Sequence, residues 1–183
     1  MKSFLVLCFG LMMGLASPAL VGADVSEYTV KSAYLFNFAR FVDWPDNAFA
    51  KSTSPLVIGI VGDDPFGSAL TEAVNGKSVG THPLAVKRFG AYDKSLAGSL
   101  KKCQILFVSY SEKDNAREIL QSLEGAPVLT VSEIEKFLPL GGMILFDQDG
   151  EKIVLDVNPN KATDAGMTIS SKLLSVSKIY KGE

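Results

Sequence analysis

Two uninterrupted apolar runs of strand length constrain most strongly what this chain can fold into. LVIGIV at 56–61 and ILFV at 105–108 contain no polar or charged side chain. Strands that are apolar on both faces are typical of parallel sheets that helices cover on both sides. We therefore predict that both runs form central strands of such a sheet.

Helical segments alternate with strand-like segments along the rest of the chain. Strands are predicted at 56–62, 81–89, 104–109 and 127–131, and helices at 25–43, before 74, before 102, at 111–123 with Ser111 as N-cap, and at 132–142. A turn at Asp149-Gly150 predicts a β-hairpin over 143–157, and a last helix is predicted to bury Leu173, Leu174 and Val176. The alternation predicts an α/β three-layer sandwich, with a mostly parallel sheet, one antiparallel strand from the closing hairpin, and helices on both faces.

Residues 1–23 have the three parts of a secretory signal peptide. Lys2 precedes a long apolar run, and small residues end at Ala23. The alternative is a retained membrane anchor, but glycines and a proline dilute the run below the roughly 20 apolar residues that a spanning helix needs. We predict cleavage after Ala23 and a single domain over 24–183.

Charge and cysteine content restrict the partners of the exported chain. The full sequence has a formal net charge of −2, and cleavage removes only the positive charge of Lys2, which leaves −3 on the exported chain. This mild acidity gives no basic field for nucleic acid and no polybasic patch for a membrane surface. Cys103 is the only cysteine left after cleavage, so an internal disulfide is excluded. Its place beside an apolar strand favours a buried thiol, with an intermolecular disulfide or redox role left open.

No motif in the chain indicates catalysis, a metal or a cofactor. His82 is the only histidine, and no G-x-S-x-G segment follows a predicted strand. GDDPFG at 62–67 lacks the pattern of a phosphate-binding loop, and DQDG at 147–150 starts like a calcium loop but lies in the hairpin. We predict a protein that is not an enzyme.

The segment VKSAYLFNFARFVDWP at 30–45 is rich in aromatic residues. Its helical periodicity predicts a stripe that packs on the sheet: Tyr34, Leu35, Phe38, Phe41 and Val42. Phe36 lies about 200° around the helix from Tyr34, and Trp44 follows the helix. Both are therefore candidates for a surface that contacts a partner protein, and a second layer of core contacts is the alternative.

This segment, VLTVSEIEKFLPLGGMILF at 128–146 and AGMTISSKLLSV at 165–176 together resemble the YfiR family of bacterial periplasmic proteins. The resemblance implies a periplasmic repressor that binds the periplasmic sensor domain of an inner-membrane GGDEF diguanylate cyclase. Repression would lower cyclic-di-GMP, exopolysaccharide and biofilm formation, and an outer-membrane lipoprotein is a second implied partner. Known members can carry disulfide-forming cysteine pairs. This chain departs from that pattern.

Two groups of residues are candidates for binding. The partner-binding candidates are Phe36, Trp44, Pro45, Met167 and Ile169, and for the final segment, 167–174, a core role is the alternative that the buried stripe of the last helix favours. The alternative function is a periplasmic small-molecule binder, with an anion-binding cluster of Asn37, Arg40 and Lys172 if the first and last helices are neighbours. The aromatic residues are also compatible with a homodimer.

Overall fold

The computed structural model describes residues 26–150 and 152–182. The predicted signal peptide lies outside the described residues. The strands are β1 (Val42–Asp43), β2 (Leu56–Val61), β3 (Ser78–Val79), β4 (His82–Arg88), β5 (Ile105–Val108), β6 (Leu129–Ser132), β7 (Ile144–Asp149), β8 (Lys152–Val157), β9 (Thr168–Ile169) and β10 (Lys178–Ile179). The α-helices are α1 (Glu27–Phe41), α2 (Ser68–Val74), α3 (Ala97–Leu100), α4 (Ala116–Ser122), α5 (Pro159–Asp164) and α6 (Ser171–Leu174).

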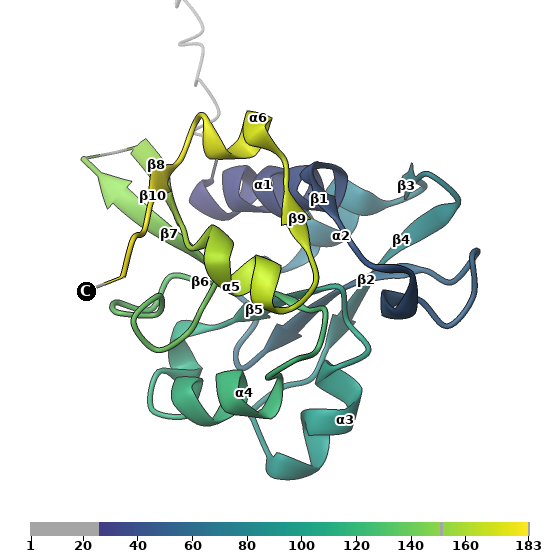
Figure 1. The fold of residues 1–183 in the computed structure, drawn as a ribbon, viewed down its shortest axis with the longest axis horizontal. Helices are drawn as coiled ribbons and strands as arrows, with labels where there is room; N and C mark the ends of the chain where they lie inside the picture. The colour runs from purple at the N-terminus through teal and green to yellow at the C-terminus, as the bar shows by residue number, and fades with distance from the viewer. Residues whose placement is uncertain (1–25, 151, 183) are drawn as a thin grey trace, which may run out of the picture.

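An eight-stranded sheet in the order β10-β8-β7-β6-β5-β2-β4-β3 lies between two layers of helices (Figure 1). β2 and β5 are parallel neighbours inside the sheet, as predicted from their apolar runs. The α/β three-layer sandwich is confirmed, and so is the hairpin of β7 and β8. The described part of the chain has no helix that is long and apolar enough to cross a membrane.

More strands run antiparallel to the central strands of the sheet than the sequence predicts. β3 pairs with β4 in antiparallel register, and β10 runs parallel to β8, so that both run against the central strands. β3 has only two residues and turns back through Gly80, whose φ of +56° suits glycine. A strand this short has no periodicity from which it could be predicted.

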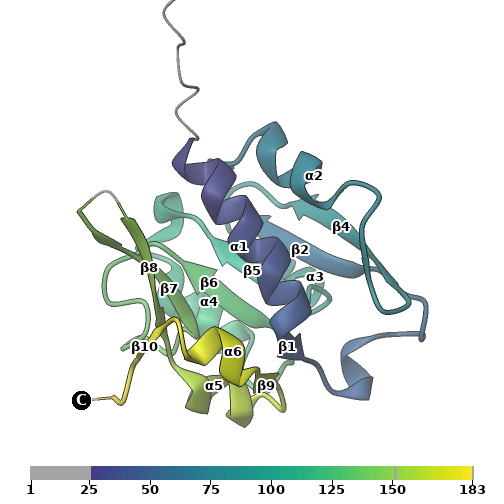
Figure 2. The same ribbon diagram turned by 90° about the horizontal axis from the view of Figure 1, so that it is seen from above.

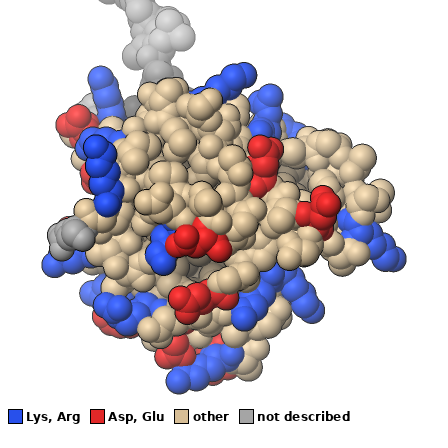
Figure 3. All heavy atoms as spheres, in the orientation of Figure 1, with Lys and Arg blue, Asp and Glu red and all other residues tan. Residues whose placement is uncertain are grey.

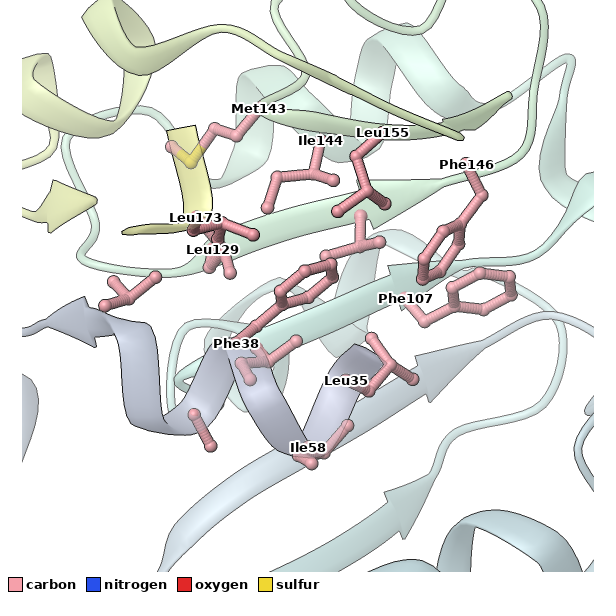
Figure 4. Close-up of a cluster of buried hydrophobic side chains, with 14 of the residues drawn as sticks. Leu35, Phe38, Ile58, Phe107, Leu129, Met143, Ile144, Phe146, Leu155 and Leu173 are labelled. Atoms are coloured by element: carbon pink, nitrogen blue, oxygen red, sulfur yellow. The ribbon is translucent and has the colours of Figure 1, made fainter. Parts of the chain in front are cut away.

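α1 crosses one face of the sheet (Figure 2) and contributes the predicted aromatic core. Phe38 and Leu35 are fully buried, and Phe38 stacks on Phe146 with ring centroids 5.9 Å apart (Figure 4). The predicted stripe is displaced around the helix, however. Its members Tyr34 and Phe41 are only half-buried. The buried side of the helix includes Lys31 in their place.

α3, α4 and the turns after β6 cover the opposite face with a second apolar cluster. The predicted helix at 132–142 is wrong, because this segment forms consecutive turns. Gly142 packs directly against the ring of the fully buried Phe137, which leaves no room for a side chain, and Gly141 has a φ of +107°. The Gly141-Gly142 pair therefore has a structural role in this turn. The predicted N-cap at Ser111 is also wrong, since α4 begins at Ala116.

The end of the chain differs most from prediction. α6 ends at Leu174, and just beyond it the hydroxyls of Ser175 and Ser177 donate to carbonyl oxygens of the helix, at 3.0 and 2.7 Å. The chain then becomes β10. Val176 is 71% exposed and Ile179 is 41% exposed, so the predicted buried stripe stops within α6.

Candidate functional site

A two-stranded ribbon joins the aromatic segment to the last of the three quoted segments. β1 pairs with β9 in antiparallel register, with Val42 opposite Ile169. The amide of Ser170 donates to the carbonyl oxygen of Phe41 at 2.8 Å. α6 therefore lies beside the end of α1 (Figure 2). We call the outer surface of the C-terminal half of α1, the β1–β9 ribbon and α6 the docking face.

The ribbon changes which residues of its second strand can reach a partner. Met167 and Ile169 are 1% and 7% exposed, so both side chains belong to the core and not to the surface proposed from the sequence. Alternation along β9 turns Thr168 outward, and Lys172 follows on the exposed side of α6. The part of this segment that a partner could contact is therefore the side of Thr168 and Lys172, opposite to Met167 and Ile169.

Trp44 and Pro45 are half-buried below the end of α1. The indole Nε1 of Trp44 donates to the backbone oxygen of Gln104 at 3.2 Å. The side chain of Gln104 in turn accepts from the amide of Val57 at 2.8 Å and donates to the carbonyl of Ala48 at 2.6 Å. Trp44 therefore belongs to a hydrogen-bonded clasp at the amino ends of β2 and β5. Its polar edge is already occupied within the chain.

Phe36 is half-buried and lies between two cations. The Nζ of Lys77 is 4.3 Å from the centroid of its ring, and the Cζ of Arg40 is 5.8 Å away. Arg40 is also 6.0 Å from the ring centroid of Phe41. We call Phe36, Arg40, Phe41 and Lys77 the basic–aromatic array. Lys77 follows α2, and no spacing in the sequence relates it to α1.

The predicted anion-binding cluster is only loosely assembled. Its helices are neighbours, as the prediction requires, and Arg40 and Lys172 are exposed while Asn37 is half-buried. No hydrogen bond or ion pair joins any two of these three described residues. The arrangement is an open surface and not an enclosed anion site.

A buried ion network fastens the opposite end of α1 to the sheet. Lys31 is 3% exposed, and its Nζ lies 2.5 Å from a carboxylate oxygen of Glu133 and 2.5 Å from one of Glu27. The hydroxyl of Tyr28 also donates to Glu133 at 3.2 Å. Burial acts to lower the pKa of Lys31, but the two carboxylates outweigh it and hold that pKa above its ordinary value. Lys31 is therefore charged at neutral pH.

At the carboxyl edge of the sheet, where open α/β folds hold ligands, the turn after β5 packs against the end of β2. A Cβ at Gly62 would lie 2.5 Å from the Oγ of Ser111 and 2.8 Å from the Cγ of Glu112. Asp64 is held by the Nε of Arg88 at 2.5 Å. Ser111 and Glu112 therefore pack closely against the end of β2, and Asp64 is engaged by Arg88.

A cavity of about 370 Å³ opens elsewhere, between α4 and α5. Its apolar wall includes Leu120, Leu123 and Met143, and its rim includes Lys161 and Asp164. In Figure 3 the surface is hollowed between these helices and bordered by charged side chains of both signs. The same view shows a broad area with few charges over β9 and α6. The periodicity of single helices gives no sign of this cavity.

His82 and Cys103, the two candidates for catalytic or redox chemistry, are both packed within the fold. The ring of His82 stacks on Phe49 with centroids 3.8 Å apart, and its Nδ1 lies 2.7 Å from the carbonyl oxygen of Ser54. Cys103 is 1% exposed. Among the described residues, no group of three or more His, Cys, Asp or Glu side chains is arranged to hold a metal ion.

We expect Cys103 to be inert toward thiol reagents while the protein is folded. Burial raises the pKa of its thiol to about 11, so that almost no thiolate exists at neutral pH. Iodoacetamide at pH 7.5 should leave the native protein unlabelled and alkylate it after denaturation in urea, as mass spectrometry would report. Rapid labelling of the native protein would instead reveal a reactive cysteine.

The chain resembles proteins of known family and structure. The model of the family DUF4154, YfiR/HmsC-like, matches residues 28–178. The crystal structure of a conserved domain protein from Vibrio cholerae O1 biovar eltor is similar with a TM-score of 0.56 at 13% identity. That match covers 85% of this chain and 60% of the other, so the chain spans less than two thirds of that protein and the likeness concerns the fold alone. Because the family model covers most of its length, the chain belongs to the YfiR/HmsC-like family.

Proposed function

We propose that this protein is a periplasmic repressor that binds the periplasmic sensor domain of an inner-membrane diguanylate cyclase through the docking face. Family membership supports a regulatory role in the periplasm. The single observation that supports the docking face is the β1–β9 ribbon, which joins two of the three family-like segments on one surface. The output would be lower cyclic-di-GMP and less biofilm.

The composition of the docking face is suited to protein contact. The half-buried rings of Phe36 and Phe41 on α1 lie beside the ribbon and α6, where Thr168 and Lys172 are exposed, and few charges lie over β9 and α6. Protein interfaces are typically poor in charge at the centre and polar at the rim. The hydrogen-bonded ribbon also holds these residues in place before binding, which lowers the entropy lost in a complex.

Repression requires only that the protein bind the inactive cyclase more tightly than the active one. Such a ligand shifts the equilibrium between the two states by the ratio of its affinities, about tenfold for each 1.4 kcal/mol. No chemical step in the repressor is needed. An outer-membrane lipoprotein that competed for the docking face would release the cyclase by shifting the same equilibrium in the opposite direction.

Co-purification from the native membrane tests this proposal. The full chain with an affinity tag after Glu183 is expected to recover a GGDEF-containing membrane protein from gently solubilised membranes. Phe36→Ala should lose that protein while keeping its fold by circular dichroism. Tyr110→Ala is the matched control, because Tyr110 is 55% exposed and lies on the loop before α4, outside the docking face. Absence of any cyclase with the wild-type chain would contradict the proposal.

Small-molecule binding is the second candidate function, and the cavity between α4 and α5 favours it. Its volume of about 370 Å³ falls within the range of about 300–1,000 Å³ common for ligand sites. Such a site would differ in place from the cluster of Asn37, Arg40 and Lys172. Replacing Met143, which lines it, with a larger Phe should then abolish ligand binding without affecting recovery of the cyclase.

A further inference from the structure

We propose that the basic–aromatic array recognises an acidic segment of the partner, with Asp or Glu carboxylates contacting Arg40 and Lys77. The identity of the partner rests on the function proposed above. The preference of the array for carboxylates does not, because it follows from contacts within this chain.

The array presents its cations in defined positions. The ring of Phe36 has Lys77 at 4.3 Å and Arg40 at 5.8 Å, and Arg40 also reaches toward Phe41 at 6.0 Å. Cations near aromatic faces are attracted by the ring quadrupole, which restricts otherwise flexible side chains. A guanidinium that packs against rings in this way still has N–H groups for a carboxylate. The rings therefore position the charges without neutralising them.

The charges of the array have no acidic partner within the described chain. Arg88, Lys94 and Lys178 each lie within 4.0 Å of a carboxylate, at 2.5, 3.4 and 3.8 Å. Arg40 and Lys77 have no such ion pair among the described residues. Lys172 on the neighbouring α6 is likewise exposed and without an ion pair among the described residues, while Asp43 of β1 places one exposed negative charge on the docking face.

Charge complementarity selects a protein carboxylate over other occupants. Anionic membranes attract clusters of about 4–8 cations, and the array with Lys172 offers fewer. Arg40 and Lys77 combine opposite charge with flanking aromatic surface, which suits a segment where acidic side chains alternate with apolar ones. The partner segment should therefore be acidic, and its attraction should depend on salt.

A defined peptide tests the array without the cyclase. We would titrate the ¹⁵N-labelled protein with a synthetic decapeptide of alternating Glu and Leu, and with its Gln–Leu counterpart, following amide shifts by NMR. The Glu–Leu peptide is expected to shift amides at 36–41, 77 and 170–172, and the Gln–Leu peptide should not. Raising the salt from about 0.1 M to about 1 M shortens the Debye length from about 10 Å to about 3 Å and should suppress the shifts.

Charge reversal supplies the matched comparison. Arg40→Glu combined with Lys77→Glu should weaken peptide binding and slow cyclase association by about tenfold or more. The neutral pair Arg40→Gln and Lys77→Gln should show an intermediate loss. Lys113→Glu is the control, because Lys113 also lies over an exposed ring, Tyr110, at 5.4 Å but outside the docking face.

The outcomes separate this inference from the proposed function. If the cyclase binds equally well to the wild type and to the charge-reversed variant, the inference is overturned and the repressor function stands. If the Glu–Leu peptide binds at the array but no cyclase is recovered, the inference stands and the function falls. Equal binding of the Glu–Leu and Gln–Leu peptides would also overturn it, because the array would then read apolar surface alone.

Discussion

Replacing Glu133 with alanine is expected to lower the free energy of unfolding by about 3 kcal/mol or more. The substitution leaves Lys31, whose side chain is 4% exposed, without the better buried of its two carboxylates. Glu27 remains 2.5 Å away, but its side chain is 41% exposed and so compensates only in part. Urea denaturation followed by circular dichroism measures the change.

Two variants control this prediction. Glu27→Ala removes the more exposed partner and should cost less than about 1 kcal/mol. Lys31→Met combined with Glu133→Gln removes both charges at similar volume and should recover most of the stability lost in Glu133→Ala. Equal losses for Glu27→Ala and Glu133→Ala would show that burial of the pair contributes nothing.

The same network predicts an alkaline limit to stability. Since the pKa of Lys31 is higher in the folded state than its ordinary value of 10.5, its contribution is complete below that value. The contribution disappears as the pH rises through the folded-state pKa. In strongly alkaline buffer, the free energy of unfolding of the wild type should therefore fall relative to that of the variant with Lys31→Met and Glu133→Gln.

Replacing Phe38 with alanine is expected to cost about 3–5 kcal/mol, the usual range for a large aromatic side chain lost from a core. Phe38 is fully buried, and its ring lies 5.9 Å from that of Phe146 and 6.2 Å from that of Tyr34. Cavity formation adds to the lost burial, because the surrounding core relaxes only in part around a removed ring. Chemical denaturation of the two proteins measures the difference.

Phe36→Ala is the counterpart on the same helix. Its ring is half-buried, so we expect a loss of about 1 kcal/mol in stability and a much larger effect on partner recovery. The two variants thus assign the aromatic residues of α1 to core and surface by independent measurements. A loss of stability at Phe36 as large as that at Phe38 would make Phe36 a core residue.

Segments with a strong local pattern were predictable from the sequence. The apolar runs of β2 and β5 could lie only inside a covered sheet, and the Asp149-Gly150 turn gave the hairpin of β7 and β8. The end of the chain was not predictable in this way. α6 ends at Leu174 and the chain pairs as β10 from Lys178, so that Val176 lies between the two elements and is exposed instead of buried.

Which side chains are exposed on the docking face could not be predicted from the sequence. Phe36 and Arg40 were singled out by their place on the helix, whereas Lys77 reaches the array from the turn after α2. Met167 and Ile169 were assigned to the surface because the two-residue β9 is too short to show which face is buried. Which side chains of β9 face the core is determined only by its pairing with β1.

The buried charge of Lys31 was also beyond the sequence. Glu27 and Lys31 are spaced i, i+4, which is typical of an exposed helix pair. Glu133 approaches from the segment after β6, more than a hundred positions away. The carboxylate of Glu133 compensates the buried charge of Lys31, and no local sequence pattern predicts this contact.

Cyclic-di-GMP in living cells tests the central claim most directly. Its concentration should be measured in the wild-type strain, in a strain lacking this gene, and in that strain supplied with the wild-type protein or with Phe36→Ala. A repressor predicts a rise on deletion, a return to the original level with the wild-type protein, and little return with Phe36→Ala at equal protein abundance. An unchanged concentration in all four strains would contradict the account.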